Sequence, residues 1–495
     1  MIENPETGEE KGVQSEYEIR LGKRAEMLKK GINPYAFKFT RSHKTSEIKE
    51  NETDFVAKEQ AVEICGKVYS VRAHGGSIFA DLADFSGKLQ IYAKSDELGE
   101  EKFKIFEEFV GTGDFLGVKG KVFKTKKGEL SVLISDFEIL SKALRPTPAS
   151  WYGLSHTEKR FRERYLDILL NEDVKTRFKK RAQIMDAIRD TLRRGDFLEI
   201  ETPVLHPIYG GANARPFKTY YESLKQDFYL RISNELYLKR AIVGNLEKVF
   251  EFSRDFRNEG IDATHNPEFT MIEIYEAYKD YNDFLELTKE LILKANAAAG
   301  NSEKILWGEK QIDLGGQWPK KKLNDLLKEK TGLDVLNFPE IELQKYAESI
   351  GLKMPPKTNW GVLVDKIFTA KVEPTLINPT FVIDYPVEIS PLAKRHRNEE
   401  KLTERFELYI GGKEIANGFS ELTDPVEQRA RFEEEQKHRT KGDLEAHPLD
   451  EDFILAQEYG MPPTAGVGIG IDRLAMLLTN AVNIREVIMF PQLKS

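Results

Sequence analysis

Polar and apolar residues alternate along residues 268–275, and this alternation predicts a β-strand with two chemically different faces. Successive side chains of a strand point to opposite sides, so Phe269, Glu273 and Tyr275 share one face. The opposite face carries the residues that we expect to enter a hydrophobic core, Thr270, Ile272 and Ile274. The strand therefore predicts an acidic and aromatic surface on the side away from that core.

A second run, residues 417–421, repeats the pattern, because Asn417, Phe419 and Glu421 fall on one face of a predicted strand. Carboxylates beside aromatic rings on a half-buried face are costly unless a cation pairs with them. The two runs together predict a pocket for a small molecule with an ammonium group. Arg257, a short way upstream, could bind a phosphate or carboxylate beside that ammonium.

The amino-terminal part of the chain predicts a helix followed by a small all-β domain. Residues Glu16 to Lys30 are charged and stop at Gly31, which is typical of a helix and its end signal. From about Asp54 to Leu140, short alternating runs are separated by glycine turns, which predicts about five strands in a barrel of the oligonucleotide-binding (OB) kind. The Pro-Thr-Pro at residues 146–148 predicts a linker to a larger domain.

Basic residues concentrate between Arg20 and Lys44, where eight Lys and Arg residues stand against one acid, Glu26. Aromatic residues interleave with them, at Tyr35, Phe37 and Phe39. A nucleic-acid contact and a solvated helix face with a linker fit this pattern equally well.

The rest of the chain predicts a larger α+β domain. A helix is expected over Val174–Arg194, followed by a strand over residues 197–203. Pro203 either ends that strand or places it at a sheet edge, where helix and strand would form a dimer surface. The strands predicted over residues 248–252 and 268–275 form an expected antiparallel hairpin, and the long loop between them is a suitable place to bind a phosphate.

Two further segments complete this domain. Residues 300–376 are lysine-rich and predict a helical insertion without chemistry of its own. Residues 466–470 carry glycine at alternate positions of a predicted strand, which leaves one face open to a ligand or another backbone. Arg473 would then lie at the start of a helix.

Composition limits the class of protein. A chain of 495 residues predicts two or three domains, and 40% apolar with 32% charged residues fits a globular protein with a sizeable core. No apolar run is long enough to span a bilayer, and residues 1–12 do not resemble a secretory signal. The single cysteine, Cys65, excludes an internal disulfide and favours a cytoplasmic location. The net charge of −8 argues against a surface coated in positive charge, but not against local basic patches.

Common nucleotide and metal motifs are absent from the sequence. The glycines of residues 466–470 lack the spacing of the dinucleotide fingerprint, and there is no G-x-x-x-x-G-K-S/T loop or H-E-x-x-H helix. Eight scattered histidines and one cysteine also make a zinc site a poor prediction.

Arginines and carboxylates remain as the candidate chemistry. Arg257 and Arg473 are permanent cations suited to phosphate, and Glu407 and Glu414, on either side of a predicted Gly-Gly turn, are suited to Mg²⁺. Phe269 offers a flat face for a base, and Arg473 could cover the other side of that base. The residues therefore predict an ATP site without a phosphate loop, next to the amine pocket.

Three longer motifs resemble those of class II aminoacyl-tRNA synthetases. Residues 256–260 (FRNEG) and 265–270 (HNPEFT) resemble motif 2, and residues 468–474 (GIGIDRL) resemble motif 3. The helix and strand that end at Pro203 resemble motif 1, the dimerisation element. The order of these parts matches the class over nearly the whole chain.

Two further sequence segments point to one subgroup. Residues 235–240 (ELYLKR) and 414–422 (EIANGFSEL) are similar to those of bacterial-type lysyl-tRNA synthetases. The resemblance implies a helix and basic arm over residues 1–53, an OB-fold anticodon-binding domain over 54–145, and a catalytic domain over 151–495. In the catalytic domain it implies an antiparallel sheet flanked by helices, so the fold class is α+β.

The resemblance also implies a role for each matched residue. Arg257 would bridge the amino-acid carboxylate and the α-phosphate, and Arg473 would bind the γ-phosphate and adenine. Phe269 would stack on adenine, and the further ATP contacts would be Glu259, His265, Asn266 and Glu407. Glu407 and Glu414 would bind Mg²⁺. The lysine pocket would consist of Gly211, Glu235, Arg257, Glu273, Tyr275, Asn417, Phe419 and Glu421.

In the barrel, Arg72, Phe79 and Gln90 match the anticodon contacts of the aspartyl, asparaginyl and lysyl subgroup. Base stacking and an amide that reads a base edge would be the physical basis of recognition. From the residues alone, however, Phe79 is better placed in the barrel core. All three anticodons share a central uridine, so these positions do not single out lysine.

The implied reaction is the activation of L-lysine by ATP, with Mg²⁺, followed by transfer to tRNA(Lys). The implied enzyme is a cytoplasmic homodimer that does not bind a membrane. The acids Glu273 and Glu421 would repel an aspartate side chain, which favours lysine as the amino acid. Two alternatives are a paralogue that lysylates a protein, against which the barrel argues, and a non-enzymatic binding protein, against which the retained arginines and glutamates argue.

Overall fold

The computed structural model describes residues 15–147, 157–354, 358–440 and 448–494, without the side chains of residues 438–440. The chain divides into two compact units, Met1–Gly153 and Leu154–Ser495. Residues 1–12 and position 148 of the expected linker lie outside the described residues.

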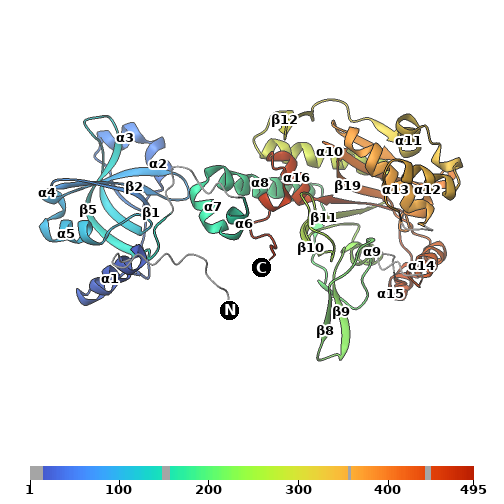
Figure 1. Cartoon of the computed structure of the whole chain (residues 1–495), viewed down its shortest axis with the longest axis horizontal. Coiled ribbons are helices and arrows are strands. Elements are labelled where there is room, and N and C mark those ends of the chain that lie inside the picture. Colours follow the sequence, from blue (N-terminus) through green and yellow to red (C-terminus); the bar gives the residue numbers. More distant parts are fainter. Residues whose placement is uncertain (1–14, 148–156, 355–357, 441–447, 495) are drawn as a thin grey trace. The chain divides into compact units, whose positions relative to one another are not determined.

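The first unit contains a closed barrel of five strands in the order β1-β2-β3-β5-β4 (Figure 1), as the sequence predicts. Its strands are β1 (Ala61–His74), β2 (Ser77–Ala83), β3 (Lys88–Lys94), β4 (Phe115–Lys124) and β5 (Leu130–Ser141). β3 and β5 pair in parallel, and the other neighbours are antiparallel. Side chains alternate along β2, so that Ile78, Ala80 and Leu82 fill the barrel core.

Five helices accompany the barrel: α1 (Glu16–Lys29), α2 (Thr45–Glu50), α3 (Glu52–Ala57), α4 (Ser95–Leu98) and α5 (Glu100–Phe109). The predicted first helix is confirmed, and it begins with a capping box between Ser15 and Glu18. The prediction of β-structure from Asp54 is wrong, because residues 52–57 form α3. Acids in the first turn of α3, Glu52 and Asp54, favour its helical conformation.

The second unit is built on an eight-stranded sheet in the order β14-β15-β18-β19-β20-β11-β10-β6. These strands are β6 (Leu198–Glu199), β10 (Lys248–Phe256), β11 (Glu268–Ala277), β14 (Lys320–Lys322), β15 (Thr380–Ile383), β18 (Arg405–Ile410), β19 (Lys413–Ser420) and β20 (Thr464–Gly470). The two outermost pairs, β14–β15 and β10–β6, are parallel, and the inner pairs are antiparallel.

Helices surround this sheet: α6 (Thr157–Arg162), α7 (Arg164–Leu170), α8 (Glu172–Arg194), α9 (Glu235–Val243), α10 (Tyr281–Ala298), α11 (Leu323–Thr331), α12 (Glu340–Ser349), α13 (Trp360–Lys371), α14 (Pro425–Thr440), α15 (Glu451–Glu458) and α16 (Ile471–Leu478). The small strands are β7 (Leu205–His206), β8 (Lys218–Tyr221), β9 (Gln226–Leu230), β12 (Lys304–Trp307), β13 (Lys310–Asp313), β16 (Arg395–His396) and β17 (Glu399–Thr403). None of the helices in the described ranges combines the length and the apolar composition needed to cross a membrane.

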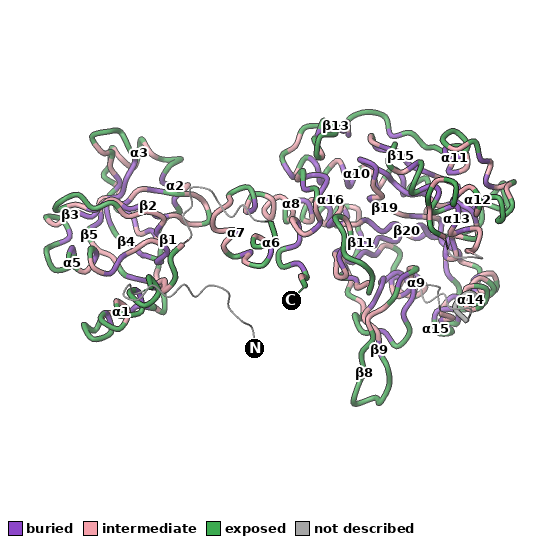
Figure 2. Tube along the Cα trace, in the orientation of Figure 1, coloured by how far each residue is buried: buried purple, intermediate pink, exposed green. Residues whose placement is uncertain are grey.

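The main core lies between the sheet and the two long helices α8 and α10. Ile184 and Ile188 of α8 and Ile292 of α10 pack in one cluster with Ile272 and Ile274 of β11. Figure 2 shows the buried trace along the central strands β11, β19 and β20. The predicted core face of residues 268–275 is therefore confirmed.

Two expectations for this unit need correction. Only Leu198–Glu199 forms a strand, at the sheet edge and parallel to β10, so Pro203 lies beyond the strand. The segment 300–376 is not simply helical, because it opens with the β12–β13 hairpin and contributes β14 to the central sheet before α11–α13. These strands are three or four residues long, too short for an alternating pattern to be recognised.

Candidate active site

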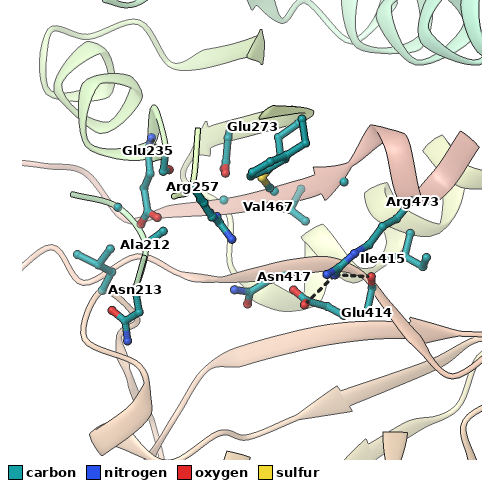
Figure 3. Close-up of a pocket in the computed structure, with 18 of the residues that line it drawn as sticks. Ala212, Asn213, Glu235, Arg257, Glu273, Glu414, Ile415, Asn417, Val467 and Arg473 are labelled. Atoms are coloured by element: carbon teal, nitrogen blue, oxygen red, sulfur yellow. Dashed lines mark hydrogen bonds and ion pairs between the residues drawn. The ribbon is translucent and has the colours of Figure 1, made fainter. Parts of the chain in front are cut away.

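A cavity of about 410 Å³ lies over the central sheet, on the face that α8 and α10 do not cover. Its walls come from β11, β19, β20, the loop after β10 and the starts of α9 and α16 (Figure 3). The lining includes every residue predicted for this domain except Glu407 and Glu421, which are buried. Acids, arginines and aromatic rings from distant parts of the chain thus meet in one place.

The alternating glycines of β20 make room for this arrangement. A Cβ atom on Gly468 would lie 2.7 Å from Oε1 of Glu273, and one on Gly466 would overlap the carboxylate of Glu421 and the ring of Tyr275. The sequence predicts space for a ligand or a backbone at these glycines. In the structure, the space is taken by the side chains of the amine pocket.

Three carboxylates predicted for the amine pocket are buried: Glu235 at the start of α9, Glu273 in β11 and Glu421 just after β19. The Tyr275 hydroxyl donates a hydrogen bond of 3.0 Å to Glu273. Burial and the negative charges of Glu235 and Asp255 raise the pKa of Glu273 well above its usual range. Such an excess of negative charge favours the binding of a cation.

The other predicted members of this pocket lie around the three acids. Gly211 has a φ of +86°, and a Cβ there would lie 2.8 Å from Oγ of Ser233. Asn417 accepts a hydrogen bond of 3.1 Å from Nε of Arg405. The ring centre of Phe419 lies 5.1 Å from Nζ of Lys239, a buried lysine of α9.

Two basic residues that pair with predicted acids are missing from the sequence-based prediction. One is the lysine of α9, Lys239, which stands one helical turn after Glu235. The other is Arg405, two positions before Glu407 on the same face of β18. The sequence carried a signal for each. Lys239 stands four residues from Glu235 on a helix, and Arg405 two residues from Glu407 on a strand, and both spacings place a cation beside a predicted acid.

At the other end of the cavity, Arg473 lies in the first turn of α16, as the sequence predicts. Its guanidinium donates to the backbone oxygen of Glu414 at 3.1 Å and to the carboxylate at 3.2 Å (Figure 3). Its other terminal nitrogen lies 3.0 Å from Nε2 of His265. Asp472 fixes the start of this helix by accepting from the backbone N–H of Thr270 at 2.7 Å.

The loop between β10 and β11 has its own network of hydrogen bonds. Nδ1 of His265 lies 2.7 Å from a carboxylate oxygen of Asp262. Burial opposes the shift, but hydrogen bonds from Thr264 and His265 lower the pKa of Asp262 to about 2. The Asn266 amide donates to the Glu268 backbone oxygen at 2.6 Å, and Glu259 also lines the cavity.

The arginine that lies against Phe269 is Arg257, whose guanidinium carbon is 5.0 Å from the ring centre. The sequence predicts Arg473 opposite this ring, with a base between them. The structure instead brings Arg473 to Glu414 and His265. Both arginines nevertheless reach the same cavity.

Glu407 and Glu414 lie on the predicted hairpin, β18 and β19, joined by glycines of positive φ at 411 and 412. Glu407 accepts hydrogen bonds from the Tyr385 hydroxyl at 2.9 Å and from Arg405 at 2.5 Å. Burial raises the pKa of Glu407 to about 7 against the effect of Arg405, and the charge of Glu414 adds to the rise.

These two carboxylates fit a magnesium ion that also binds phosphate oxygens. Among the described residues, no group of three or more His, Cys, Asp or Glu side chains could hold a metal ion alone. Mg²⁺ typically takes one or two carboxylates and completes its shell with phosphate oxygens and water. The repulsion between Glu407 and Glu414 is what a divalent cation would relieve.

In the first unit, the predicted anticodon contacts lie on the outer surface of the barrel. Phe79 is half-buried and stacks on Tyr92 with ring centres 4.4 Å apart, so its placement in the barrel core is wrong. Arg72 is exposed and pairs with Asp81, and Gln90 accepts from the Ser131 hydroxyl at 2.9 Å.

The aromatic surface is wider than the sequence indicates. Tyr92 also lies 5.9 Å from the ring of Phe123 in β4, and neither residue is among the predicted contacts. Their positions alternate with buried core residues, a signal that the sequence carried.

Two family models match the chain. Residues 156–494 match the model described as tRNA synthetases class II (D, K and N), and residues 62–140 match the OB-fold nucleic acid binding domain. Fold and site thus define a class II tRNA synthetase of this group.

Sequence similarity to individual proteins identifies the family within this class. Proteins named Lysine–tRNA ligase are similar over nearly their whole lengths. The one from Carboxydothermus hydrogenoformans is 48% identical over 477 residues, 96% of this chain and 97% of that protein. The one from Thermotoga maritima is 47% identical over 481 residues, 96% and 95% of the two chains. The chain belongs to the lysine–tRNA ligase family.

Proposed function

We propose that this chain activates L-lysine with ATP and then transfers the lysyl group to the 3′ end of tRNA(Lys). One observation carries the proposal: two carboxylates, Glu235 and Glu273, line one cavity with two arginines, Arg257 and Arg473 (Figure 3). A third carboxylate, that of Glu421, is buried next to them, beside Tyr275. A ligand with two ammonium groups and one carboxylate, next to a triphosphate, has the complementary charges.

In the first step, a carboxylate oxygen of lysine attacks the α-phosphorus of ATP. The bond from that phosphorus to the oxygen bridging the β-phosphate breaks, so pyrophosphate leaves and lysyl-adenylate forms. Arg257 would bind the lysine carboxylate and the α-phosphate, while Arg473 would bind the γ-phosphate. The arginines stay charged throughout, so the protein contributes positioning and charge neutralisation.

Other residues would hold ATP in place. Phe269 would stack on the adenine, and the loop between β10 and β11 would supply Glu259, His265 and Asn266. The hydrogen bond between His265 and Asp262 orients the imidazole before ATP binds, which lowers the ordering cost of binding.

Glu407 and Glu414 would hold Mg²⁺, which neutralises phosphate charge when it is bound. The protein orients both acids independently of the ion. Arg405 and Tyr385 hold the carboxylate of Glu407, and Arg473 holds that of Glu414. The Tyr409 hydroxyl also donates to Glu407, so three hydrogen bonds reach that carboxylate and at least one oxygen lone pair of each acid remains for a cation.

The amine pocket would bind both ammonium groups of lysine. Gly211 and Glu235 would contact the α-ammonium, while Glu273 and Glu421 would pair with the side-chain ammonium. The side chain of Ser233 lies so close to Gly211 that it leaves no room for a Cβ atom at position 211. The remaining walls would be Tyr275, Asn417 and Phe419.

In the second step, the terminal 3′-hydroxyl oxygen of tRNA attacks the lysyl carbonyl carbon, an ester forms and AMP leaves. The barrel would bind the anticodon through Arg72, Phe79 and Gln90. The stacked pair of Phe79 and Tyr92 supports this assignment, because unpaired bases stack on exposed aromatic rings.

We further propose a homodimer that works in the cytoplasm. Apolar side chains are exposed on and after β6, at Leu198, Val204, Leu205 and Ile208. An exposed apolar group of this kind beside the sheet edge fits an interface between copies. A sedimentation mass of a single 56.8 kDa chain at micromolar concentration would rule the dimer out.

Exchange of labelled pyrophosphate into ATP, tested with each amino acid separately and without tRNA, examines the first step. Exchange with lysine alone is expected, because only lysine supplies two ammonium groups at the right separation. Exchange with aspartate or asparagine would overturn the assignment of the amine pocket. Folded protein without exchange for any amino acid would favour a non-enzymatic binding protein.

A further inference from the structure

Lys239 of α9 is completely buried and lies between two of the acids assigned to the amine pocket. Its Nζ atom lies 2.5 Å from Oε1 of Glu235 and also forms an ion pair with Glu421. The ammonium additionally lies 5.1 Å from the ring centre of Phe419. One protein ammonium thus contacts three residues assigned to binding the lysine ligand.

When all three acids of the amine pocket are ionised beside a bound ligand, their charges balance only if Lys239 is counted. Glu235, Glu273 and Glu421 carry three formal negative charges, whereas lysine brings two ammonium groups and its carboxylate is assigned to Arg257. Without Lys239, a third carboxylate would stay buried without a partner, which is strongly unfavourable. With Lys239, two net negative charges remain for two ammonium groups.

Lys239 also connects the two ends of the pocket. Glu235 belongs to α9 and Glu421 follows β19, so the two acids are on elements that the sequence separates widely. The two negative charges outweigh the effect of burial and raise the pKa of Lys239, so its ammonium remains charged. A fully buried, charged bridge has few alternative conformations and therefore fixes the spacing of the acids that it joins.

We propose that Lys239 is a positioning residue that sets the distance between the α-ammonium and side-chain ammonium sites. It thereby determines the preference for lysine over shorter diamino acids such as ornithine. This inference rests on the proposed function, because it takes Glu235 and Glu421 as contacts of the two ends of lysine. Lys239 acts through these acids and does not itself touch the reacting atoms.

The test is lysine- and ornithine-dependent pyrophosphate exchange with the full-length chain. Lys239→Met removes the charge and keeps a similar length, so the KM for lysine is expected to rise at least about tenfold, with the KM for ATP changed less than about twofold. The ratio of kcat/KM for lysine over ornithine is expected to fall about tenfold. Lys239→Arg keeps the charge and should recover part of the lysine KM, but not the full ratio, because its fork has a different shape.

Lys142→Met is the matched control. Lys142 is a buried lysine of the first unit, paired with Asp114 at 2.7 Å, and is outside the amine pocket. Its removal is expected to lower stability without changing the lysine KM or the lysine-to-ornithine ratio. A purely structural role for Lys239 would give the same pattern in Lys239→Met, with a lower yield of active enzyme and an unchanged ratio.

The outcomes separate this inference from the proposed function. Parent protein without lysine exchange would overturn the proposed function and, with it, the ligand assumed here. The positioning role alone would be overturned by a different result. In that case the parent protein exchanges with lysine, and both Lys239 variants keep the parent's lysine KM and its ratio of kcat/KM for lysine over ornithine. If Lys239→Met does not fold, the Lys239→Arg variant decides, since a folded variant with the parent's ratio is incompatible with the proposal.

Discussion

Glu421 is the acid whose removal should distinguish lysine binding from ATP binding most clearly. It is 1% exposed, and its carboxylate is assigned to the side-chain ammonium of the ligand. Glu421→Gln keeps the shape and removes the charge, and breaking a buried charge pair costs about 2–5 kcal/mol. The KM for lysine is therefore expected to rise about 30-fold or more in pyrophosphate exchange, with little change for ATP.

Glu414→Gln provides the contrast for that experiment. Glu414 contacts Arg473 at the phosphate end of the cavity, so this variant should raise the requirement for ATP and Mg²⁺ more than that for lysine. Equal increases of both KM values in Glu421→Gln would contradict the assignment of Glu421.

Two buried titratable residues of the second unit, Asp255 and His206, predict opposite effects of pH on stability. Burial raises the pKa of Asp255 from 3.8 to about 6, so the folded state binds more protons than the unfolded state in that interval. Its contribution to stability therefore falls as the pH rises through the interval. Burial lowers the pKa of His206 from 6.5 to about 4, so its contribution to stability rises as the pH increases.

Single variants should reveal these opposing contributions. Relative to the parent, the unfolding free energy of Asp255→Asn is expected to increase by about 3 kcal/mol between pH 4 and pH 7. For His206→Gln, the same difference is expected to decrease by about 3 kcal/mol. Urea unfolding at a series of pH values measures both, and slopes of the same sign would show that the burial argument fails for one residue.

At the scale of elements, how well the sequence predicts structure depends on length and periodicity. The strand over 268–275 has a clear period of two, and its two faces are found as predicted. The helix over 172–194 is long and amphipathic, and was predicted to within two residues at its start. Strands of two to four residues, such as β6 and β12, are too short to give a usable pattern, and β6 also pairs with a strand far away in the sequence, β10.

Prediction of the site residues is likewise limited to those that follow a local sequence pattern. Glu273 and Glu421 could be found because alternation puts them beside aromatic residues on one face, whereas Glu235 follows only from the family resemblance. The spacing from Glu235 was the signal available for Lys239, but that spacing alone does not place Lys239 in the pocket, because its contact with Glu421 depends on α9 packing beside the end of β19. A lysine one turn after a glutamate otherwise predicts an ordinary surface pair.

The glycines of β20 give a prediction for a whole element. A Cβ atom on Gly466 would overlap Glu421 and Tyr275, so Gly466→Ala should displace the acids of the pocket. Overpacking of this kind costs about 1–3 kcal/mol, and the lysine KM is expected to rise while the ATP KM changes little. Thermal unfolding and pyrophosphate exchange measure the two effects.

Gly470→Ala is the comparison on the same strand. The nearest atom to its added Cβ would be 3.8 Å away, an ordinary contact. Its effect on stability and on the lysine KM should therefore be much smaller. Similar losses in both variants would mean that the glycines serve backbone conformation rather than space for side chains.

At the scale of the whole molecule, the two units have separate cores and carry different parts of the proposed reaction. The barrel core is a closed cluster of its own, and the cavity lies entirely in the second unit. Activation of lysine needs only that cavity, whereas recognition of tRNA would also use the outer surface of the barrel. Changes on that surface should therefore affect the second step without affecting the first.

Phe79→Ala tests this separation. Loss of one stacking surface costs about 1–3 kcal/mol, so charging of tRNA is expected to fall about 5- to 150-fold in kcat/KM for tRNA. Lysine-dependent pyrophosphate exchange without tRNA is expected to stay at the parent level, because Phe79 is a half-buried surface residue of the barrel. Phe85→Ala is the control, since Phe85 is 73% exposed in the same unit and is not among the residues predicted to contact the anticodon. A parallel loss of exchange in Phe79→Ala would mean that the variant disturbs folding or activation, and unchanged charging would remove Phe79 from the tRNA surface.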